Sequence, residues 1–205
     1  MKKNILVVLD LNGTILHRIK KSSKQTKTFI ATGEPDFEVP RNKVYMRPLV
    51  AEFFAFLSCR FHVAVWTSAM THNSTLLVEK MKSDFGAPDF RFIWSQDKCK
   101  IIPSYKKPKF RKELEKIQLE FSEFDLSNTV LVDDSFEKWQ DTPLNGIPIR
   151  TFDISVNIRD RELEYTMEYL QTLYDSYPTL NVPQFIDKNK YRSNTEANLV
   201  DERNK

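Results

Sequence analysis

The sequence predicts an α/β fold in which a parallel sheet is flanked by helices. Three short runs are almost entirely apolar and rich in β-branched residues. This composition is typical of strands in a parallel sheet, because both faces of such a sheet are buried. They span residues 5–9, 61–66 and 129–132. A polar residue follows each run directly, namely Asp10, Thr67 and Asp133. We therefore expect these runs to form parallel strands of one sheet.

Amphipathic segments between and after these runs supply the helices that such a sheet requires. Apolar residues recur at helical spacing in residues 48–57, 74–81, 110–121 and 163–174. The first segment begins at Pro48, which a first helical turn tolerates. We expect the last segment to be the final element of the core. Strands that alternate with helices in this way are typical of α/β folds.

Two polar segments interrupt the alternation. Residues 20–43 begin with a basic run and contain glycine and prolines, which predicts a flap or irregular hairpin over one end of the sheet. Residues 90–109 hold short apolar pieces and predict a second, strand-containing insertion. Because residues 188–205 are polar and aperiodic, they predict a disordered tail after a single domain at 1–187.

Length and composition favour one globular unit. The chain has 205 residues, of which 40% are hydrophobic and 29% are charged, so disorder, collagen and coiled coil do not explain the whole of it. Its net charge of +3 is too small to indicate nucleic-acid binding by itself. No apolar stretch is long enough to span a membrane. Cys59 and Cys99 match neither a disulfide framework nor a paired metal motif, which indicates a reducing intracellular compartment, the nucleus or the cytoplasm.

The polar residues at the strand ends mark the expected functional site. In an open parallel sheet, ligands bind beyond the carboxyl ends of the strands, so Asp10, Thr67 and Asp133 should converge there. Taken singly, an aspartate after a strand is most often a helix cap or a turn residue. Three such residues in one sheet are harder to explain in that way.

The segments around these residues resemble motifs of the haloacid dehalogenase superfamily. The chain reads Val-Leu-Asp-Leu-Asn-Gly-Thr over 8–14, Val-Trp-Thr-Ser-Ala over 65–69 and Val-Leu-Val-Asp-Asp-Ser over 130–135. The closer resemblance, over residues 4–186, is to the FCP/SCP-like phosphatases, which act on the RNA polymerase II carboxy-terminal domain and on other phosphoproteins. Further matching phrases lie at residues 45–49, 93–99 and 107–114. The resemblance implies a haloacid dehalogenase-like, Rossmannoid fold and an FCP-homology catalytic domain.

The resemblance also implies a role for each motif residue. Asp10 would attack phosphorus as a carboxylate nucleophile and form an aspartyl-phosphate. A Mg²⁺ ion prefers oxygen ligands, and its ligands would be Asp10, the backbone carbonyl of Asn12, Asp133 and Asp134. Thr67, with Ser68 beside it, would bind the phosphoryl oxygens, and a lysine would offset the charge that develops there.

The identity of this lysine is open between two positions. Lys106, Lys107, Lys109 and Lys112 crowd the segment before the third motif. In the family the lysine precedes an acid-leucine pair, and Lys112 with Glu113 and Leu114 fits that phrase. We therefore favour Lys112 over Lys107 for both catalysis and substrate binding.

Asn12 departs from the family pattern, which has an aspartate that acts first as general acid and then as general base. An amide cannot deliver a proton at neutral pH, and a positioned acid or base contributes about 10²- to 10⁴-fold, so turnover should be slowed by that order. His17 and His72 are candidates for a substitute acid, although each is more often an ordinary polar residue. Asn12 is compatible with a slow natural enzyme, a natural binding-only protein or an engineered substitution.

Three functions therefore stay open. The leading hypothesis is a Mg²⁺-dependent phosphatase of Ser/Thr-phosphorylated proteins or peptides, with the RNA polymerase II carboxy-terminal domain as one candidate substrate. The second is a catalytically impaired phosphopeptide-binding or scaffold protein on the same fold, which Asn12 favours. The third is a nucleic-acid end phosphatase, suggested by basic residues in 20–27 and 98–112. Nucleic acid is the less favoured partner because basic loops are usually only solvated.

Overall fold

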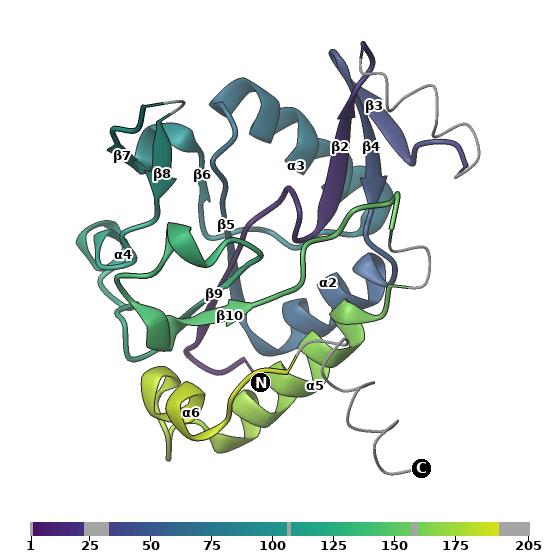
Figure 1. Cartoon of the computed structure of the whole chain (residues 1–205). Coiled ribbons are helices and arrows are strands. Elements are labelled where there is room, and N and C mark those ends of the chain that lie inside the picture. The colour runs from purple at the N-terminus through teal and green to yellow at the C-terminus, as the bar shows by residue number, and fades with distance from the viewer. Residues whose placement is uncertain (1, 23–32, 106–107, 157–159, 193–205) are drawn as a thin grey trace, which may run out of the picture.

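A five-stranded parallel sheet forms the centre of the computed structural model, which describes residues 2–22, 33–105, 108–156 and 160–192 (Figure 1). Its strand order is β10-β9-β1-β5-β6, and every neighbouring pair is parallel. The strands are β1 (Leu6–Leu9), β5 (His62–Trp66), β6 (Ile93–Trp94), β9 (Thr129–Asp133) and β10 (Gly146–Pro148). The predicted α/β fold with a central parallel sheet is confirmed.

The central strand β1 explains why the apolar runs are unbroken. All of its residues are fully buried, because neighbouring strands flank both of its edges and helices cover both of its faces. Leu9 is in register with Val65 of β5 and with Val132 of β9. The polar residues Asp10, Thr67 and Asp133 therefore end up at the same edge of the sheet.

Helices cover the two faces of the sheet unequally. On one face, Ile5, Val7 and Leu9 share a hydrophobic cluster with residues of α2 (Val50–Arg60), α3 (Thr71–Phe85), α5 (Glu162–Ser176) and α6 (Val182–Lys188). On the other face, Leu6 and Val8 pack in a second cluster with Ile117 of the short helix α4 (Lys116–Glu120). The large core thus lies under the long helices, whereas α4 covers the opposite face (Figure 1).

Two predicted helices differ from the structure. The first begins at Val50 rather than Pro48, because Leu49 has a left-handed backbone with φ of 66°. The predicted helix over 110–121 is wrong in its first part: β8 (Lys109–Arg111) pairs antiparallel with β7 (Lys100–Ile102). In that pairing, Phe110 lies opposite Ile101, a tertiary partner that the local spacing does not report.

The expectation that the segment at 163–174 is the final core element is also wrong. Helix α6 follows α5 and buries Val182, Phe185 and Ile186 against the core. Asn181 begins α6 with a capping box, since its side chain accepts from the Gln184 N–H while the Gln184 side chain accepts from the Asn181 N–H. A cap of this kind stabilises a helix as short as α6.

The predicted flap is a three-stranded antiparallel sheet with the order β2-β4-β3. Its strands are β2 (Leu16–Lys20), β3 (Phe37–Val39) and β4 (Asn42–Met46), so it extends on both sides of the predicted 20–43. The second insertion is shorter than predicted, because Ile93 and Trp94 belong to the central sheet as β6. Its remainder contains a short 3-10 helix (Gln96–Lys98) and the β7–β8 pair.

The C-terminal segment is anchored as far as it is described. Tyr191 donates a hydrogen bond to Glu162 Oε1 at 2.9 Å, and its ring packs edge-on against Tyr169. Residues 193–205 lie outside the described residues, so the disordered tail and the domain boundary near Lys188 stay predictions. Cys59 is exposed, Cys99 is buried, and both thiols are free. None of the described helices combines the length and the apolar character that crossing a membrane would require.

Candidate active site

The loop between β1 and β2 turns sharply after Asp10 and passes close to Asp134, just beyond the end of β9. The carbonyl of Leu11 accepts hydrogen bonds from the backbone N–H groups of Thr14, Ile15 and Leu16, which closes the turn. Gly13 has φ of 89°, and a Cβ atom at that position would lie 2.3 Å from Asp134 Oδ2. Only glycine therefore fits this close passage of the loop past Asp134.

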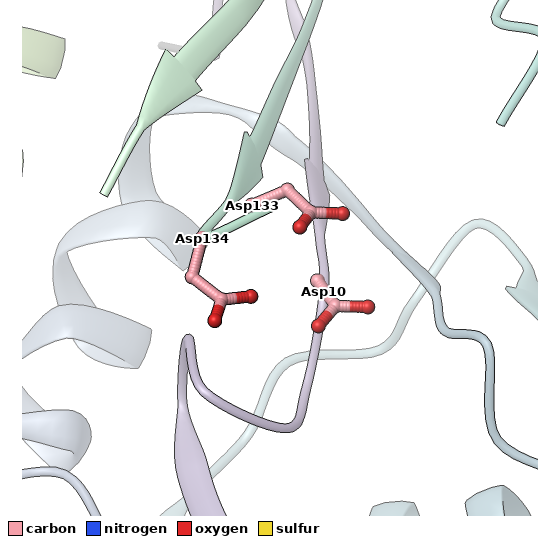
Figure 2. Close-up of side chains that lie close together, drawn as sticks. All are labelled: Asp10, Asp133 and Asp134. Carbon is pink, nitrogen blue, oxygen red and sulfur yellow. The ribbon is translucent and has the colours of Figure 1, made fainter. Parts of the chain in front are cut away.

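Three carboxylates meet at this edge of the sheet. Asp10, Asp133 and Asp134 each offer an oxygen, and these oxygens lie within 4.8 Å of one another (Figure 2). Asp10 and Asp133 are buried, whereas Asp134 is partly exposed. Hydroxyl groups hold Asp134, since Thr151 Oγ1 donates to its Oδ2 at 2.9 Å and Ser135 Oγ donates to its Oδ1 at 3.2 Å.

Lys112 contacts two of these carboxylates directly. Its Nζ donates to Asp10 Oδ1 at 2.8 Å and to Asp133 Oδ2 at 2.6 Å, and its side chain is fully buried. Lys112 lies in the loop between β8 and α4, where its backbone N–H bonds to the carbonyl of Lys138. Of the two lysines that the sequence left open, Lys112 thus lies at the site, and Lys107 lies outside the described residues.

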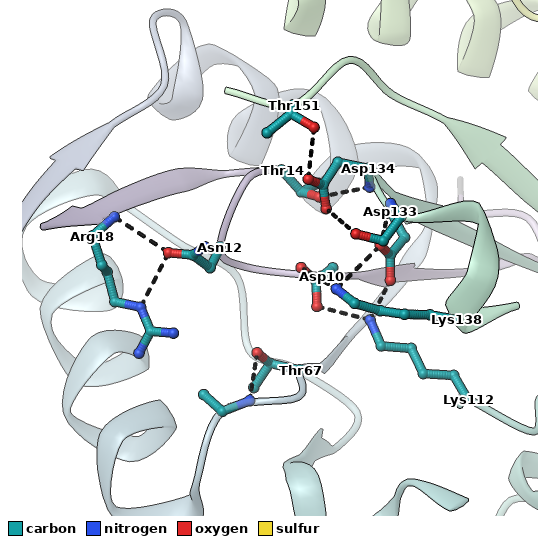
Figure 3. Close-up of polar contacts among 12 residues, drawn as sticks. Asp10, Asn12, Thr14, Arg18, Thr67, Lys112, Asp133, Asp134, Lys138 and Thr151 are labelled. Carbon is teal, nitrogen blue, oxygen red and sulfur yellow. Dashed lines mark hydrogen bonds and ion pairs between the residues drawn. The ribbon is translucent and has the colours of Figure 1, made fainter. Parts of the chain in front are cut away.

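A second lysine at the site, Lys138, is absent from the residues predicted from the sequence. Its Nζ lies 3.6 Å from Asp10 Oδ2 and 3.5 Å from Asp133 Oδ1 (Figure 3). It ends a short 3-10 helix, Phe136–Lys138, that begins two residues after Asp134. The available signal in the sequence was a lysine in the turn that follows Asp133 and Asp134.

The two lysines set the ionisation of the site. Burial would raise the pKa of Asp10, but Lys112 and Lys138 together hold that pKa below its usual value. Burial raises the pKa of Asp133, and the neighbouring Asp10 charge adds to this rise against the two lysines. Burial lowers the pKa of Lys138, but the surrounding carboxylates outweigh burial and raise it above its usual value. Asp10 is therefore ionised and Lys138 charged at neutral pH.

The carboxylate cluster fits a small divalent cation. Mg²⁺ binds oxygen ligands at about 2.0–2.1 Å, so opposite ligands of one ion lie about 4.2 Å apart. Oxygens of Asp10, Asp133 and Asp134 within 4.8 Å of one another are close to that spacing. The loop that carries Asn12 passes the same cluster, since Gly13 next to it lies against Asp134.

Thr67 and Ser68 follow β5, next to the strand that carries Asp10. The backbone N–H of Thr67 bonds to the Trp94 carbonyl at 2.9 Å, which ties the start of this loop to β6. Thr67 Oγ1 accepts from the Ala69 N–H at 3.2 Å, and Figure 3 shows this hydroxyl across Asp10 from Asp134. Thr67 is buried and Ser68 is half-buried.

The side chains of Asn12 and His17 do not join the carboxylate cluster. Asn12 is exposed, and its side-chain oxygen faces Arg18. His17 Nδ1 accepts from the Ile154 N–H at 3.1 Å and lies 3.3 Å from the Asp153 carboxylate. Because that nitrogen accepts, this ring is in its neutral form.

A basic hollow of about 850 Å³ lies between the flap and the start of α3. Its lining includes Lys20, Lys21, Arg41, Met70, His72 and Asn73. Met70 is three positions beyond Thr67, so the hollow adjoins the loop that carries the predicted phosphate-binding hydroxyls. His72 therefore lies in this hollow and does not belong to the carboxylate cluster.

Comparison with known proteins gives one consistent result. Residues 5–180 match the sequence model of a family described as NLI interacting factor-like phosphatases. A Schizosaccharomyces pombe protein, described as an uncharacterized FCP1 homology domain-containing protein, is 28% identical over 96% of this chain and 81% of its own length.

Solved structures share the fold. The structure of Fcp1, an essential RNA polymerase II CTD phosphatase, superimposes with a TM-score of 0.64 at 15% identity, over 90% of this chain and 70% of that one. A fission yeast Fcp1 variant bound to beryllium fluoride gives a TM-score of 0.50 at 16% identity, over 97% of this chain and 56% of that one. The likeness to these structures concerns the fold.

Proposed function

Because the chain belongs to the NLI interacting factor-like phosphatase family, we propose that it hydrolyses Ser/Thr-phosphorylated proteins with the help of Mg²⁺, through an aspartyl-phosphate on Asp10. The observation that carries this proposal is the buried Asp10 carboxylate, ion-paired to Lys112 and clustered with Asp133 and Asp134. An ionised carboxylate at the carboxyl end of a central strand supports this role, because ligands of open parallel sheets bind at that edge and a carboxylate can attack phosphorus.

In the first step an Asp10 oxygen bonds to phosphorus, and the bond from phosphorus to the serine or threonine oxygen breaks. The leaving oxygen takes the electron pair of that bond and needs a proton. Lys112 would offset the charge on the phosphoryl oxygens, and the hydroxyls of Thr67 and Ser68 would donate hydrogen bonds to them. The short contact between Lys112 and Asp10 supports this role, because the ammonium group already lies at the reacting carboxylate.

The cluster would also hold the metal ion. Asp10, Asp133, Asp134 and the carbonyl of Asn12 would bind Mg²⁺, which neutralises phosphoryl charge when bound. Hydrogen bonds from Thr151 and Ser135 support that role, because they hold the Asp134 carboxylate in one orientation. In the second step water attacks phosphorus, the aspartyl-phosphate bond breaks, and Asp10 is restored.

Asn12 provides no group for proton transfer. Asn12 cannot donate a proton to the leaving oxygen or accept one from water. The enzyme would therefore be slow on alkyl phosphates such as phosphoserine. The same observation favours a second candidate function, a phosphopeptide-binding or scaffold protein that retains the fold and the binding groups.

The basic hollow supports a phosphorylated, acidic peptide as the substrate class. Lys20, Lys21 and Arg41 line it next to the Thr67 loop, and lysine and arginine bind phosphate and carboxylate groups. The similarity to Fcp1 makes the RNA polymerase II carboxy-terminal domain one candidate, in which case the chain would act in the nucleus; other phosphoproteins of the nucleus or cytoplasm are the alternatives.

Phosphate release from p-nitrophenyl phosphate and from a phosphoserine peptide, each with and without Mg²⁺, tests the proposal. Asp10→Asn should abolish release and also the acid-trapped phosphoprotein detected by intact mass, whereas the surface variant Asp89→Asn should change neither. No release by the native chain or by Asn12→Asp would reject the enzyme in favour of the binding protein. Binding to nucleic acid that weakens steeply with salt would instead support an end phosphatase.

A further inference from the structure

Lys138 completes a ring of alternating charges around Asp10 and Asp133. Each of these carboxylates has one oxygen bonded to Lys112, namely Asp10 Oδ1 and Asp133 Oδ2. The other oxygens, Asp10 Oδ2 and Asp133 Oδ1, face Lys138 at 3.6 and 3.5 Å (Figure 3). Lys138 thus faces the two carboxylate oxygens to which Lys112 is not bonded.

We propose that Lys138 is a built-in counter-ion, which neutralises the carboxylates in the metal-free protein and which Mg²⁺ displaces when it binds. The inference rests on the proposed function, because it assumes that the carboxylate cluster is a metal site. It assigns to Lys138 a role in setting the affinity for Mg²⁺, separate from the role of Lys112 toward phosphate.

The geometry distinguishes the two lysines. Lys112 is held at hydrogen-bond distances of 2.6 and 2.8 Å and its side chain is fully buried. Lys138 is held at 3.5 and 3.6 Å and its side chain is 16% exposed. A long, flexible lysine side chain with weaker contacts and partial exposure can move out of the cluster, whereas the fully buried Lys112 is held in it.

Charge balance points the same way. Without a metal ion, three carboxylates face two ammonium groups, so loss of Lys138 would leave a larger unbalanced negative charge in a buried place. With a divalent ion bound, the three carboxylates are balanced by that ion and Lys112 alone. Lys138 then becomes the surplus cation and is repelled from the site.

Competition between Lys138 and Mg²⁺ can be measured without an activity assay. Titration calorimetry should show about 10-fold tighter Mg²⁺ binding by Lys138→Met than by the native chain, because a cation beside the ligands has been removed. The matched control is Lys116→Met, since Lys116 pairs with Glu113 on the surface outside the cluster. That control should bind Mg²⁺ with native affinity.

Thermal unfolding gives a second readout of the same coupling. Lys138→Met should lower the melting temperature in EDTA, and saturating Mg²⁺ should remove most of that loss because the ion replaces the ammonium group. In the native chain, Mg²⁺ should raise the labelling of Lys138 by an amine-reactive reagent while Lys112 stays protected. The labelling arm needs no variant, so it holds even if Lys138→Met does not fold.

Specific results would overturn the inference. Equal Mg²⁺ affinity in the native chain, Lys138→Met and Lys116→Met would show that Lys138 does not compete with the ion. Labelling of Lys138 that Mg²⁺ leaves unchanged would show the same. Neither result would contradict the proposed phosphatase. Weaker binding by Lys138→Met would show that Lys138 organises the site for the metal. No Mg²⁺ binding by any of the three would reject both this inference and the metal requirement.

Discussion

The side-chain oxygen of Asn12 accepts two hydrogen bonds from Arg18, one from its backbone N–H and one from Nε, each at 3.2 Å. The amide oxygen of Asn12 is therefore turned toward Arg18 in β2, and the amide NH₂ group of Asn12 points away from Arg18. A carboxylate at position 12 would meet the same guanidinium group. Position 12 thus carries no acid, and Arg18 is a cation that would change the behaviour of an acid introduced there.

This contact predicts a graded rescue of activity. Asn12→Asp should raise kcat on phosphoserine, but Arg18 would stabilise the ionised form of the new carboxylate and weaken it as a proton donor. Asn12→Asp combined with Arg18→Met should gain more, by about 10²-fold over the native chain, since a positioned acid contributes at least that much. The measurement is kcat on phosphoserine peptide and on p-nitrophenyl phosphate, whose leaving group needs no acid.

Arg18→Met alone is the control and should rescue neither substrate. If the native chain handled both substrates with similar rates, another group would have to supply the proton. His72, in the hollow beside the Thr67 loop, and His17 would then be the first residues to substitute.

Lys112→Met should remove activity and also destabilise the fold. The substitution leaves Asp10 and Asp133 buried with only the more distant Lys138 between them. Breaking a buried ion pair by removing one partner costs about 3–5 kcal/mol of unfolding free energy. Urea denaturation measures the loss, and Lys100→Met, which removes an exposed pair with Glu113, should leave stability unchanged. A native-like stability for Lys112→Met would contradict the electrostatic account of the cluster.

Arg47 should prove as important for the fold as any core residue. It is fully buried, its Nε and Nη2 groups each donate to one oxygen of Asp160 at 2.9 Å, and it also donates to the carbonyls of Thr14 and Arg150. Arg47→Met should cost about 3–5 kcal/mol, because it leaves a buried carboxylate and two carbonyls unpaired. The exposed Arg161→Met provides the comparison in the same denaturation experiment and should behave as the native chain.

The pH dependence of stability should include a contribution from His17. Burial lowers the pKa of His17 against the opposing effect of Asp153, so the folded chain binds this proton less readily than the unfolded chain. The contribution of neutral His17 to the free energy of unfolding is therefore fully present above pH 6.5, the pKa of histidine in the unfolded chain. This contribution is lost as the pH falls from there through the lower pKa of the folded chain. The difference in unfolding free energy between the native chain and His17→Gln should shrink over that range. A difference independent of pH would contradict the prediction.

The basic hollow should affect peptides and leave small substrates unchanged. Replacing Lys20, Lys21 and Arg41 by alanine should raise KM for an acidic phosphopeptide by about 10-fold, since each side chain lines the hollow and a peptide extends beyond the phosphate. The KM for p-nitrophenyl phosphate should stay the same. Equal effects on both substrates would show that the hollow has no part in recognition.

The amino-acid sequence by itself determined three strands of the central sheet and the edge at which the site lies, whereas β6 and β10 became visible only in the structure. The strands β1, β5 and β9 are readable because a strand covered on both faces tolerates only apolar residues, whatever surrounds it. The polar residues at the ends of β1 and β9, Asp10 and Asp133, are then expected to lie close together, since neighbouring parallel strands end at the same edge of the sheet. Lys112 could be chosen among neighbouring lysines only through its resemblance to a family phrase.

Tertiary structure decided what local patterns do not encode. Residues 109–111 extend as β8 because β7 pairs with them, although their spacing also fits a helix. Lys138 reaches Asp10, far away in sequence, because β9 lies beside β1 and a short helix turns the lysine back over both strand ends. The periodicity of apolar residues reports which faces of a helix or strand are buried. Which charged side chains come into contact depends on the pairing of strands that are distant in the sequence, and the chemistry of one residue does not reveal its partners.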